Sequence, residues 1–372
     1  MKVAFVHDWL VVSGGAEKVT REILRTYDAD VFALVDFLSE QDRAFILGGK
    51  HATTTFIQRL PGAWGGFRNY LPLFPKAIER LDLSGYDLVL STSYAVAKGV
   101  RLRPDQVHVC YIHTPMRYAW VNESGYLADH GLETGPKAWF IRKVLERLRK
   151  WDLRTNASVD RFIANSTNVA KRVKEIYGRD ADVLLPPVDT ELFTLGTGTR
   201  THYIAANRMV PYKRVDRIIE AFRSLPDKEL LVCGDGPERA KWEARAPMNV
   251  RFLGHVEQSE FIHLLQGSKA LIAAADEDLG LTPLEAQACG TPTLALRKGG
   301  YLETISDGVS GMFFATDRAE RIAAAIRRFE RDGIQRSPAE LRAGMMNHSS
   351  ARFRERYKAL VDATIAAEHA QD

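Results

Sequence analysis

Two glutamates around a glycine are the residues of this chain with the clearest capacity for chemistry. The stretch EDLGLTPLE begins at Glu277 and ends at Glu285, and ACGTP follows it. An apolar run before the stretch predicts a strand, and its proline suits the first turn of a helix. The amides of Gly280, Leu281 and Thr282 would then point off the helix start, where free N–H groups bind anions. The carboxylates could accept hydrogen bonds from hydroxyls, although an acidic helix start explains the same pattern.

Two cations precede this stretch by about seventy residues, in NRMVPYKRVD. Arg208 follows a predicted strand, and Lys213 lies just before a predicted helix. An arginine fork and a lysine point charge together can neutralise a diphosphate. A phosphate flanked by two polyols, as in a nucleotide sugar, would satisfy the amides, the carboxylates and the cations at once. Surface charge is the alternative interpretation for either cation taken alone.

The N-terminal part of the chain offers two further candidates. HDWLVVSGGAEKV places Gly14 and Gly15 between a predicted strand and a predicted helix, where paired glycines let a ligand approach the helix N-terminus. A tight structural turn explains them equally well, and a GxGxxG dinucleotide fingerprint is absent. His113 ends another predicted strand beside polar and aromatic residues that suit the hydroxyls and ring faces of a sugar. A lone histidine, however, is more often structural.

Apolar runs that alternate with helical patterns supply the elements that position these residues. The pattern restarts after the prolines Pro186 and Pro187, which predicts two doubly wound α/β domains with parallel sheets facing across a cleft. In such sheets, ligands bind beyond the carboxyl ends of the strands. We expect an N-terminal domain over residues 1–187 and a C-terminal domain over residues 188–349. A helix over about 350–372 is expected to pack back on the first domain.

Composition bounds the class of protein. The 372 residues are enough for two domains, and 45% hydrophobic with 26% charged residues is ordinary for a globular protein. A net charge of +4 does not suggest a nucleic-acid binder. The three cysteines form no CxxC pair, so we expect neither a disulfide framework nor a zinc site. Without a signal peptide or an apolar run of about 18 residues, a cytoplasmic location is expected.

A basic, partly aromatic segment suggests contact with a membrane surface. From Lys137 to Arg154 there are seven cations against two acids, with an apolar stripe at helical spacing. Such a helix can lie on anionic lipid, on the inner face of the cell membrane. Packing of the stripe on the sheet, with the basic face in water, is the alternative. QRLPGAWGGFRNYLPLFPKAIERL is a second segment of this kind.

The motifs taken together resemble a known family. EDLGLTPLE with ACGTP, NRMVPYKRVD and GGAE occur in the order seen in glycosyltransferase family 4, whose members are retaining enzymes of the GT-B fold. The resemblance covers nearly the whole chain. VHDWL, HTPMRYAW and NYLPLFPKAIE look more narrowly like the WbaZ-like branch of bacterial O-antigen mannosyltransferases. One departure is Arg214, where many family members have glycine.

The resemblance implies roles for residues in the C-terminal half. Arg208 and Lys213 would bind the donor diphosphate, and the amides at the start of the predicted helix would meet the β-phosphate and the sugar. Glu277 would hold sugar hydroxyls, and Glu285 would accept hydrogen bonds from the ribose. His255 would lie where the backbone receives the base.

Val256 would share that position. The N-terminal half would add Gly15, whose loop approaches the diphosphate, and His113, which would contact the sugar near its 6-hydroxyl. Glu277, His113, Arg208 and Lys213 make up the expected catalytic set. None of these motifs requires a metal ion or another cofactor, so we expect neither.

The implied reaction moves a hexose from a nucleotide diphosphate sugar to a saccharide acceptor. The branch resemblance suggests mannose from GDP-mannose, and a lipid-linked acceptor in cell-surface polysaccharide, lipopolysaccharide or O-antigen synthesis. Charge on the departing diphosphate would be stabilised by the cations and the helix start. Alternatives are another donor such as UDP-glucose, an epimerase or a phosphorylase, and a non-catalytic scaffold that binds nucleotide sugars on the same fold.

Overall fold

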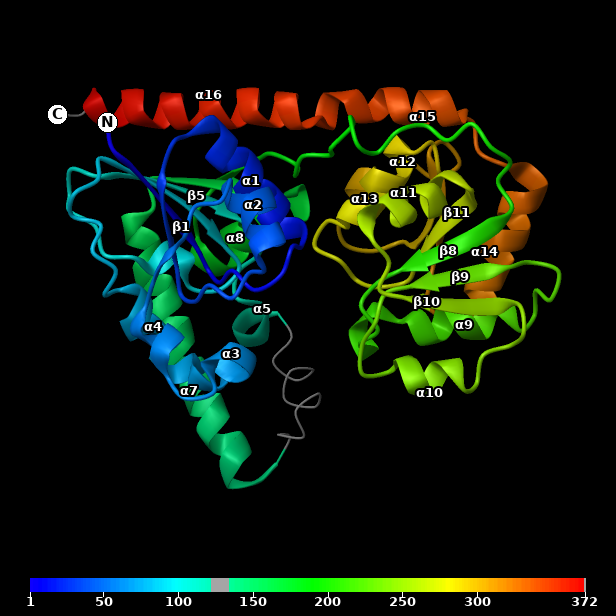
Figure 1. Cartoon of the computed structure of the whole chain (residues 1–372), viewed down its shortest axis with the longest axis horizontal. Helices are drawn as coiled ribbons and strands as arrows, with labels where there is room; N and C mark the ends of the chain where they lie inside the picture. The colour runs from blue at the N-terminus through cyan, green and yellow to red at the C-terminus, as the bar shows by residue number, and fades with distance from the viewer. Residues whose placement is uncertain (122–133, 371–372) are drawn as a thin grey trace. The chain divides into compact units, whose positions relative to one another are not determined.

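The chain folds into two compact units, each built around one parallel sheet. The computed structural model describes residues 1–121 and 134–370. Met1–Pro187 and Ala351–Asp372 form one unit, here called the first domain, and Val188–Ser350 form the other, called the second domain (Figure 1). All strand pairs of both sheets are parallel, which confirms the predicted α/β class.

The sheet of the first domain has seven strands in the order β3-β2-β1-β4-β5-β6-β7. The direction of winding reverses between β1 and β4, so this is a doubly wound sheet with its switch point there. The strands are β1 (Val3–His7), β2 (Asp30–Ala33), β3 (Thr53–Thr54), β4 (Leu88–Ser93), β5 (Val107–Ile112), β6 (Arg161–Ala164) and β7 (Ala181–Val183).

Side chains of these strands alternate between two buried clusters, as expected for a sheet covered on both faces. Ala4 and Val6 of β1 belong to the cluster shared with α3, α4 and α7, while Val3 and Phe5 belong to the cluster shared with α1, α2 and α16. The helices are α1 (Gly15–Thr26), α2 (Glu40–Leu47), α3 (Ala63–Gly66), α4 (Phe74–Ile78), α5 (Arg117–Trp120), α7 (Gly135–Arg154), α8 (Thr167–Tyr177) and α16 (Ser350–His369).

The C-terminal helix α16 is part of the first domain's core. Phe353, Tyr357 and Val361 are buried against the face that α1 and α2 also cover. Arg354 of this helix forms an ion pair with Glu22 of α1, whose side chain is buried. The expected helix therefore contacts the first domain through both apolar and charged groups; residues 371–372 lie outside the described chain.

The sheet of the second domain has six strands in the order β10-β9-β8-β11-β12-β13, with its switch point between β8 and β11. These strands are β8 (His202–Ala206), β9 (Leu230–Cys233), β10 (Val250–Gly254), β11 (Ser268–Ala273), β12 (Thr293–Leu296) and β13 (Gly311–Phe314). The helices are α9 (Val215–Phe222), α10 (Arg239–Glu243), α11 (Gln258–Gln266), α12 (Leu281–Ala288), α13 (Tyr301–Thr304), α14 (Ala319–Asp332) and α15 (Pro338–Met345).

Several strands end earlier than their sequence patterns predict. We expected one strand to end at His113 and another just before Arg208, but β5 ends at Ile112 and β8 ends at Ala206. The backbone amides of His113 and Asn207 still donate hydrogen bonds to the last residues of the neighbouring strands, Ser93 at 2.8 Å and Cys233 at 3.1 Å, as the chain enters the loops. Two short strands at sheet edges, β3 and β7, were not predicted, because neither carries a continuous apolar run.

Arg214 adopts a backbone conformation that favours glycine. It stands at the N-terminus of α9 with φ 56° and ψ 29°, and among the described residues it is the one non-glycine with positive φ. A left-handed residue with a side chain costs about 1–2 kcal/mol. The Arg214 guanidinium lies 3.0 Å from Asp317 and 3.7 Å from Asp216, and these ion pairs offset part of that cost.

This backbone geometry predicts different stabilities for two substitutions at Arg214. Arg214→Gly relieves the strain while losing the ion pairs, so the free energy of unfolding should change by less than about 1 kcal/mol. Arg214→Ala keeps the strain and loses the pairs, and should be about 1 kcal/mol less stable than the glycine variant. Urea unfolding of both proteins measures the difference, and equal stability of the two would show that the backbone is not strained.

Candidate functional site

The strongest candidate site lies at the switch point of the second sheet. Lys213 comes from the loop after β8, and Glu277 comes from the loop after β11, the strand next to β8. Connections from these two strands diverge to opposite sides, which leaves a crevice at the carboxyl edge where open α/β sheets bind ligands. The fold therefore brings together two residues that are 64 positions apart in sequence.

Lys213 and Glu277 form an ion pair in this crevice. Their side chains are only 18% and 16% exposed, so both charges are partly withdrawn from water. A partly buried pair is screened less by salt than a surface pair, and each charged group needs either its partner or ligand groups that hydrogen-bond to it in the partner's place. A donor that offers a phosphate to the lysine and hydroxyls to the glutamate would supply such a replacement.

A small cavity of about 120 Å³ opens beside this ion pair. It is smaller than the roughly 300–1,000 Å³ pockets that enclose drug-sized ligands, so it has room for part of a nucleotide sugar. Five predicted donor-binding residues line it: Lys213, Glu277, Gly280, Leu281 and Thr282. The other lining residues are Ala206, Asn207, Leu271, Ala273, Pro283 and Tyr301.

Gly280 shapes the entrance to α12. Its φ of +84° is left-handed, and a Cβ there would lie 2.6 Å from the ring of Tyr301, so only glycine fits. The helix begins at the next residue, Leu281, as the sequence predicts. Leu281 and Thr282 at the start of α12 line the cavity together with Lys213, and a helix start beside a cation favours an anion.

A second glycine fixes the loop that carries Glu277. The amide of Gly300 donates a 2.9 Å hydrogen bond to the carbonyl of Glu277, and a Cβ on Gly300 would lie 2.1 Å from Cα of Leu279. Sequence reasoning missed this clamp, and it missed Asn207 and Tyr301 as cavity residues. The paired glycines after the strand in ALRKGGYLE were the available signal.

Four other predicted residues lie at the same sheet but do not line the cavity. Arg208 is exposed after β8, and no ion pair to it forms among the described residues. Glu285 is buried inside α12. His255 and Val256 follow β10 at the sheet edge, two strands away from β8. Their roles toward a diphosphate, a ribose and a base stay predictions.

Two aspartates flank Glu277 and complete an acidic triplet. Asp276 forms a 2.9 Å ion pair with Lys298, and both of these side chains are at least half exposed. Within the chain that the structure describes, no three His, Cys, Asp or Glu side chains are grouped so that they could hold a metal ion.

His113 follows β5 in the first domain and has an unusual environment. Its Nε2 is shielded from water and has no hydrogen-bond partner among the described residues. Burial, together with the neighbouring His7, lowers the pKa of His113 to about 3. Buried polar atoms are almost always paired, so a ligand hydroxyl would satisfy this nitrogen. Tyr94 and Tyr111 contact the ring edge-on, at 6.0 and 5.2 Å between centroids.

The glycine pair near the N-terminus sits at the switch point of the first sheet. Gly14 caps α1 in an extended conformation, and Gly15 is the helix's first residue. Behind this loop, the buried carboxylate of Asp8 accepts four backbone N–H bonds of 2.6–2.9 Å from residues 94–97, which follow β4. His7 and Asp8 were visible as polar residues ending an apolar strand, but Thr92, which contacts His7, and the amides that bind Asp8 lie 85 or more positions away.

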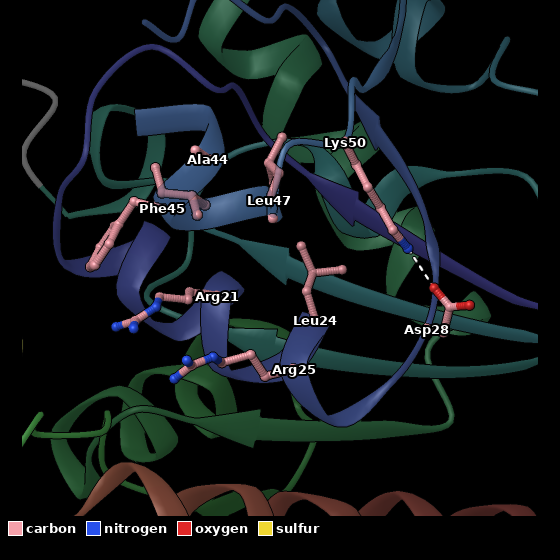
Figure 2. Close-up of a pocket in the computed structure, with 10 residues that line it drawn as sticks. Arg21, Leu24, Arg25, Asp28, Ala44, Phe45, Leu47 and Lys50 are labelled. Carbon is pink, nitrogen blue, oxygen red and sulfur yellow. Dashed lines mark hydrogen bonds and ion pairs between the residues drawn. The ribbon is translucent and has the colours of Figure 1, made fainter. Parts of the chain in front are cut away.

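A larger hollow lies elsewhere in the first domain, between α1 and α2 (Figure 2). It measures about 550 Å³, and Figure 2 shows Arg21, Arg25 and Lys50 around it, with Lys50 paired to Asp28 at 2.5 Å. Asp28 and Lys50 precede β2 and β3, so this end of the hollow is at the amino edge of the sheet. None of the predicted site residues lines it.

Comparison with known families divides the chain into two matched regions. Residues 13–192 match the family model described as Glycosyltransferase Family 4, and residues 188–345 match the model described as Glycosyl transferases group 1. A D-inositol 3-phosphate glycosyltransferase from Mycobacterium marinum is 30% identical over 217 residues, which cover 52% of this chain and 46% of that protein. The D-inositol 3-phosphate glycosyltransferase of Mycobacterium bovis is 26% identical over 292 residues, which cover 72% of this chain and 58% of that protein.

The chain thus spans about half the length of the curated relatives it matches. Among solved structures, sucrose-phosphate synthase from Thermosynechococcus elongatus superposes with a TM-score of 0.74 at 15% identity, over 99% of this chain and 100% of that one. HepE of Anabaena, in complex with UDP and glucose, superposes with a TM-score of 0.71 at 17% identity, over 97% of this chain and 99% of HepE. These likenesses confirm the predicted GT-B fold.

The environment of His113 predicts its protonation behaviour. Its pKa of about 3 lies below the ordinary value of 6.5, so folded His113 stays neutral while the unfolded chain takes up a proton. This histidine should therefore lower the stability of the fold as pH falls below about 6.5. In histidine NMR, the signal that disappears in His113→Gln should not titrate between about pH 8 and about pH 5. A midpoint near 6.5 would contradict the burial of Nε2.

Proposed function

We propose that this chain, which contains a glycosyltransferase family 4 domain followed by a glycosyltransferase group 1 domain, transfers a hexose from a nucleotide diphosphate sugar to a glycan acceptor. The sugar would keep its α configuration. The observation that supports this most directly is the cavity where Lys213, Glu277 and the first amides of α12 meet. It offers cation, anion-binding amides and a hydroxyl acceptor within one crevice.

The proposed chemistry follows from the charges at this crevice. When the bond to the sugar breaks, negative charge grows on the departing diphosphate, and Lys213, Arg208 and the α12 amides stabilise it. Fixed groups of this kind contribute several kcal/mol to catalysis. Glu277 meanwhile accepts hydrogen bonds from sugar hydroxyls, so the donor replaces the Lys213–Glu277 ion pair by two new pairings. The family resemblance assigns the same donor to Gly15 and His113 of the first domain.

The donor itself has two candidates. GDP-mannose is favoured by VHDWL, HTPMRYAW and NYLPLFPKAIE, which resemble the WbaZ-like mannosyltransferase branch. A UDP-sugar is favoured by the structural neighbour HepE, which has been solved with UDP and with UDP-glucose. The curated relatives act on inositol phosphate by name, so they support a glycosyltransferase without supporting mannose.

Nucleotide release tests both the reaction and the donor. We expect wild-type protein to release GDP from GDP-mannose faster than it releases UDP from UDP-glucose. Glu277→Ala should lower the rate by about 100-fold or more, because a group placed on the transition state is typically worth that much. Coupled measurement of GDP or UDP formation reports each rate.

A matched control is the neighbouring carboxylate Asp276. It also pairs with a lysine, Lys298, but both side chains are largely exposed, so Asp276→Ala should keep wild-type release. Faster release from UDP-glucose would replace mannose by the second candidate. Binding of a donor with no release from any of them would indicate the nucleotide-sugar-binding scaffold. Unchanged release in Glu277→Ala would remove Glu277 from the site.

The acceptor is proposed to be a lipid-linked glycan reached from a membrane surface. In α7, Val144, Leu145 and Leu148 are buried in the first domain's core, so most of the apolar stripe packs inward. Near the start of the helix, however, Trp139 and Phe140 are 64% and 53% exposed.

The second basic segment also exposes an aromatic side chain. Trp64 of α3 is 82% exposed, and its neighbour Ala63 belongs to the same buried cluster as α7. Exposed aromatics beside cations such as Lys137 and Arg142 are typical of proteins that insert at an anionic lipid interface. No described helix has the length and apolarity needed to cross a membrane.

Liposome flotation tests this surface. Wild-type protein should float with vesicles that contain about 30% anionic lipid and much less with neutral vesicles, and added salt should release it. Trp139→Ser with Phe140→Ser should lower the bound fraction severalfold. Met248→Ser, which removes a fully exposed apolar side chain from the second domain, is the control and should float normally. If the wild-type protein is equally absent from the floating fractions of both kinds of vesicle, the proposed membrane surface is wrong.

A further inference from the structure

A buried network of polar side chains contacts the N-terminal glycine loop. Glu17 of α1 accepts a 3.0 Å hydrogen bond from the amide of Gly14, and its other oxygen lies 3.4 Å from Nε2 of His7. Because a carboxylate only accepts, the His7 nitrogen is the donor of that contact. Nδ1 of His7 lies 2.6 Å from the hydroxyl of Thr92, on the neighbouring strand β4.

This buried network differs from an ordinary helix cap. The second domain has a comparable capping box at α15, where Glu340 binds the amide of Ser337 at 2.8 Å and both groups are exposed. Glu17 is only 4% exposed and His7 is fully buried. Burying a carboxylate costs free energy unless it is fully hydrogen-bonded, and an exposed glutamate would cap the helix equally well.

We propose that Glu17 and His7 are positioning residues that fix the Gly14–Gly15 loop for the donor diphosphate. The inference rests on the proposed function, in which Gly15 approaches that diphosphate. Glu17 restrains the amide of Gly14, one residue before Gly15, and His7 restrains Glu17 from the last position of β1. Thr92 in turn restrains His7, so the loop is tied to both strands at the switch point.

The same histidine also influences the proposed sugar contact. The charge of His7 acts on His113 and, after burial, is the second cause of its lowered pKa. Tyr94 lies between the two imidazoles, with its ring centroid 5.8 Å from His7 and 6.0 Å from His113. His7 is therefore linked to both first-domain residues that are proposed to meet the donor, to Gly15 through Glu17 and the amide of Gly14, and to His113 through Tyr94.

A substitution at Gly14 is an independent way to disturb the buried network, because it leaves the carboxylate of Glu17 in the protein. Its φ of −114° suits any residue, so alanine would not strain the backbone. A Cβ at this position would, however, lie 2.9 Å from the Glu17 oxygen that binds the Gly14 amide. Gly14→Ala should therefore displace Glu17 while leaving the fold in place.

Steady-state kinetics of nucleotide release test the inference. Glu17→Ala and Gly14→Ala should each lower kcat/KM for the donor by about 10–100-fold, mainly through a higher KM, because a misplaced loop weakens diphosphate binding. Glu17→Gln keeps an acceptor for the Gly14 amide, and its NH2 can donate to Nε2 of His7 in the other tautomer, in which Nδ1 donates to Thr92, so activity should recover to within about threefold of wild type. Unfolding by urea, measured on each protein, shows that it is folded under assay conditions.

The matched control is Glu340→Ala, which removes the exposed capping box of α15. It should lower stability slightly, as loss of a cap does, and leave kcat and KM unchanged. If Glu17→Ala and Gly14→Ala are folded and have wild-type kcat/KM, or if Glu17→Gln is as impaired as Glu17→Ala, the inference is wrong while the proposed function stands. If wild-type protein neither binds nor cleaves any donor, the proposed function fails and this inference fails with it.

Discussion

The ion pair between Lys213 and Glu277 is the interaction on which the candidate site depends. Its two members leave neighbouring strands, β8 and β11, whose connections run to opposite sides of the sheet. The pair therefore marks the one place at the carboxyl edge where the loops diverge and a ligand can enter. Around it, Gly280 allows α12 to begin at the crevice, and Gly300 holds the loop of Glu277 from behind. Charge, helix start and cavity thus follow from one topological feature.

The first sheet repeats this arrangement with a different chemistry. Its switch point lies between β1 and β4, where the buried side chains of His7 and Asp8 reach across to the neighbouring strand or its loop. Asp8 accepts four amides, and His7 links Thr92 to Glu17. These bonds offset part of the cost of burying the polar groups, and they add to the apolar packing of Trp9 and Val96 in the loops that follow β1 and β4. A rigid frame of this kind suits a loop that must meet a ligand closely.

Helix α7 is the segment for which the sequence left two interpretations open, packing on the sheet and contact with a membrane surface. Its central apolar residues pack into the first domain's core, as an amphipathic helix on a sheet would. Its first turns expose Trp139 and Phe140 among cations, which a core helix does not require. The helical periodicity of the apolar residues therefore identified the buried side of α7 correctly. It did not show that these two aromatic side chains are exposed.

The sequence alone predicted the α/β class, the two parallel sheets and the start of α12, because these depend on local apolar patterns, glycine and proline. It also pointed to Lys213 and Glu277, whose types and positions at strand ends suit a diphosphate sugar. The folded structure was needed to show that these two form a pair, that Tyr301 lines the cavity, and that Glu17 is buried against His7. Such contacts join residues from different elements, and strand order, which sets them, is fixed by packing rather than by local sequence.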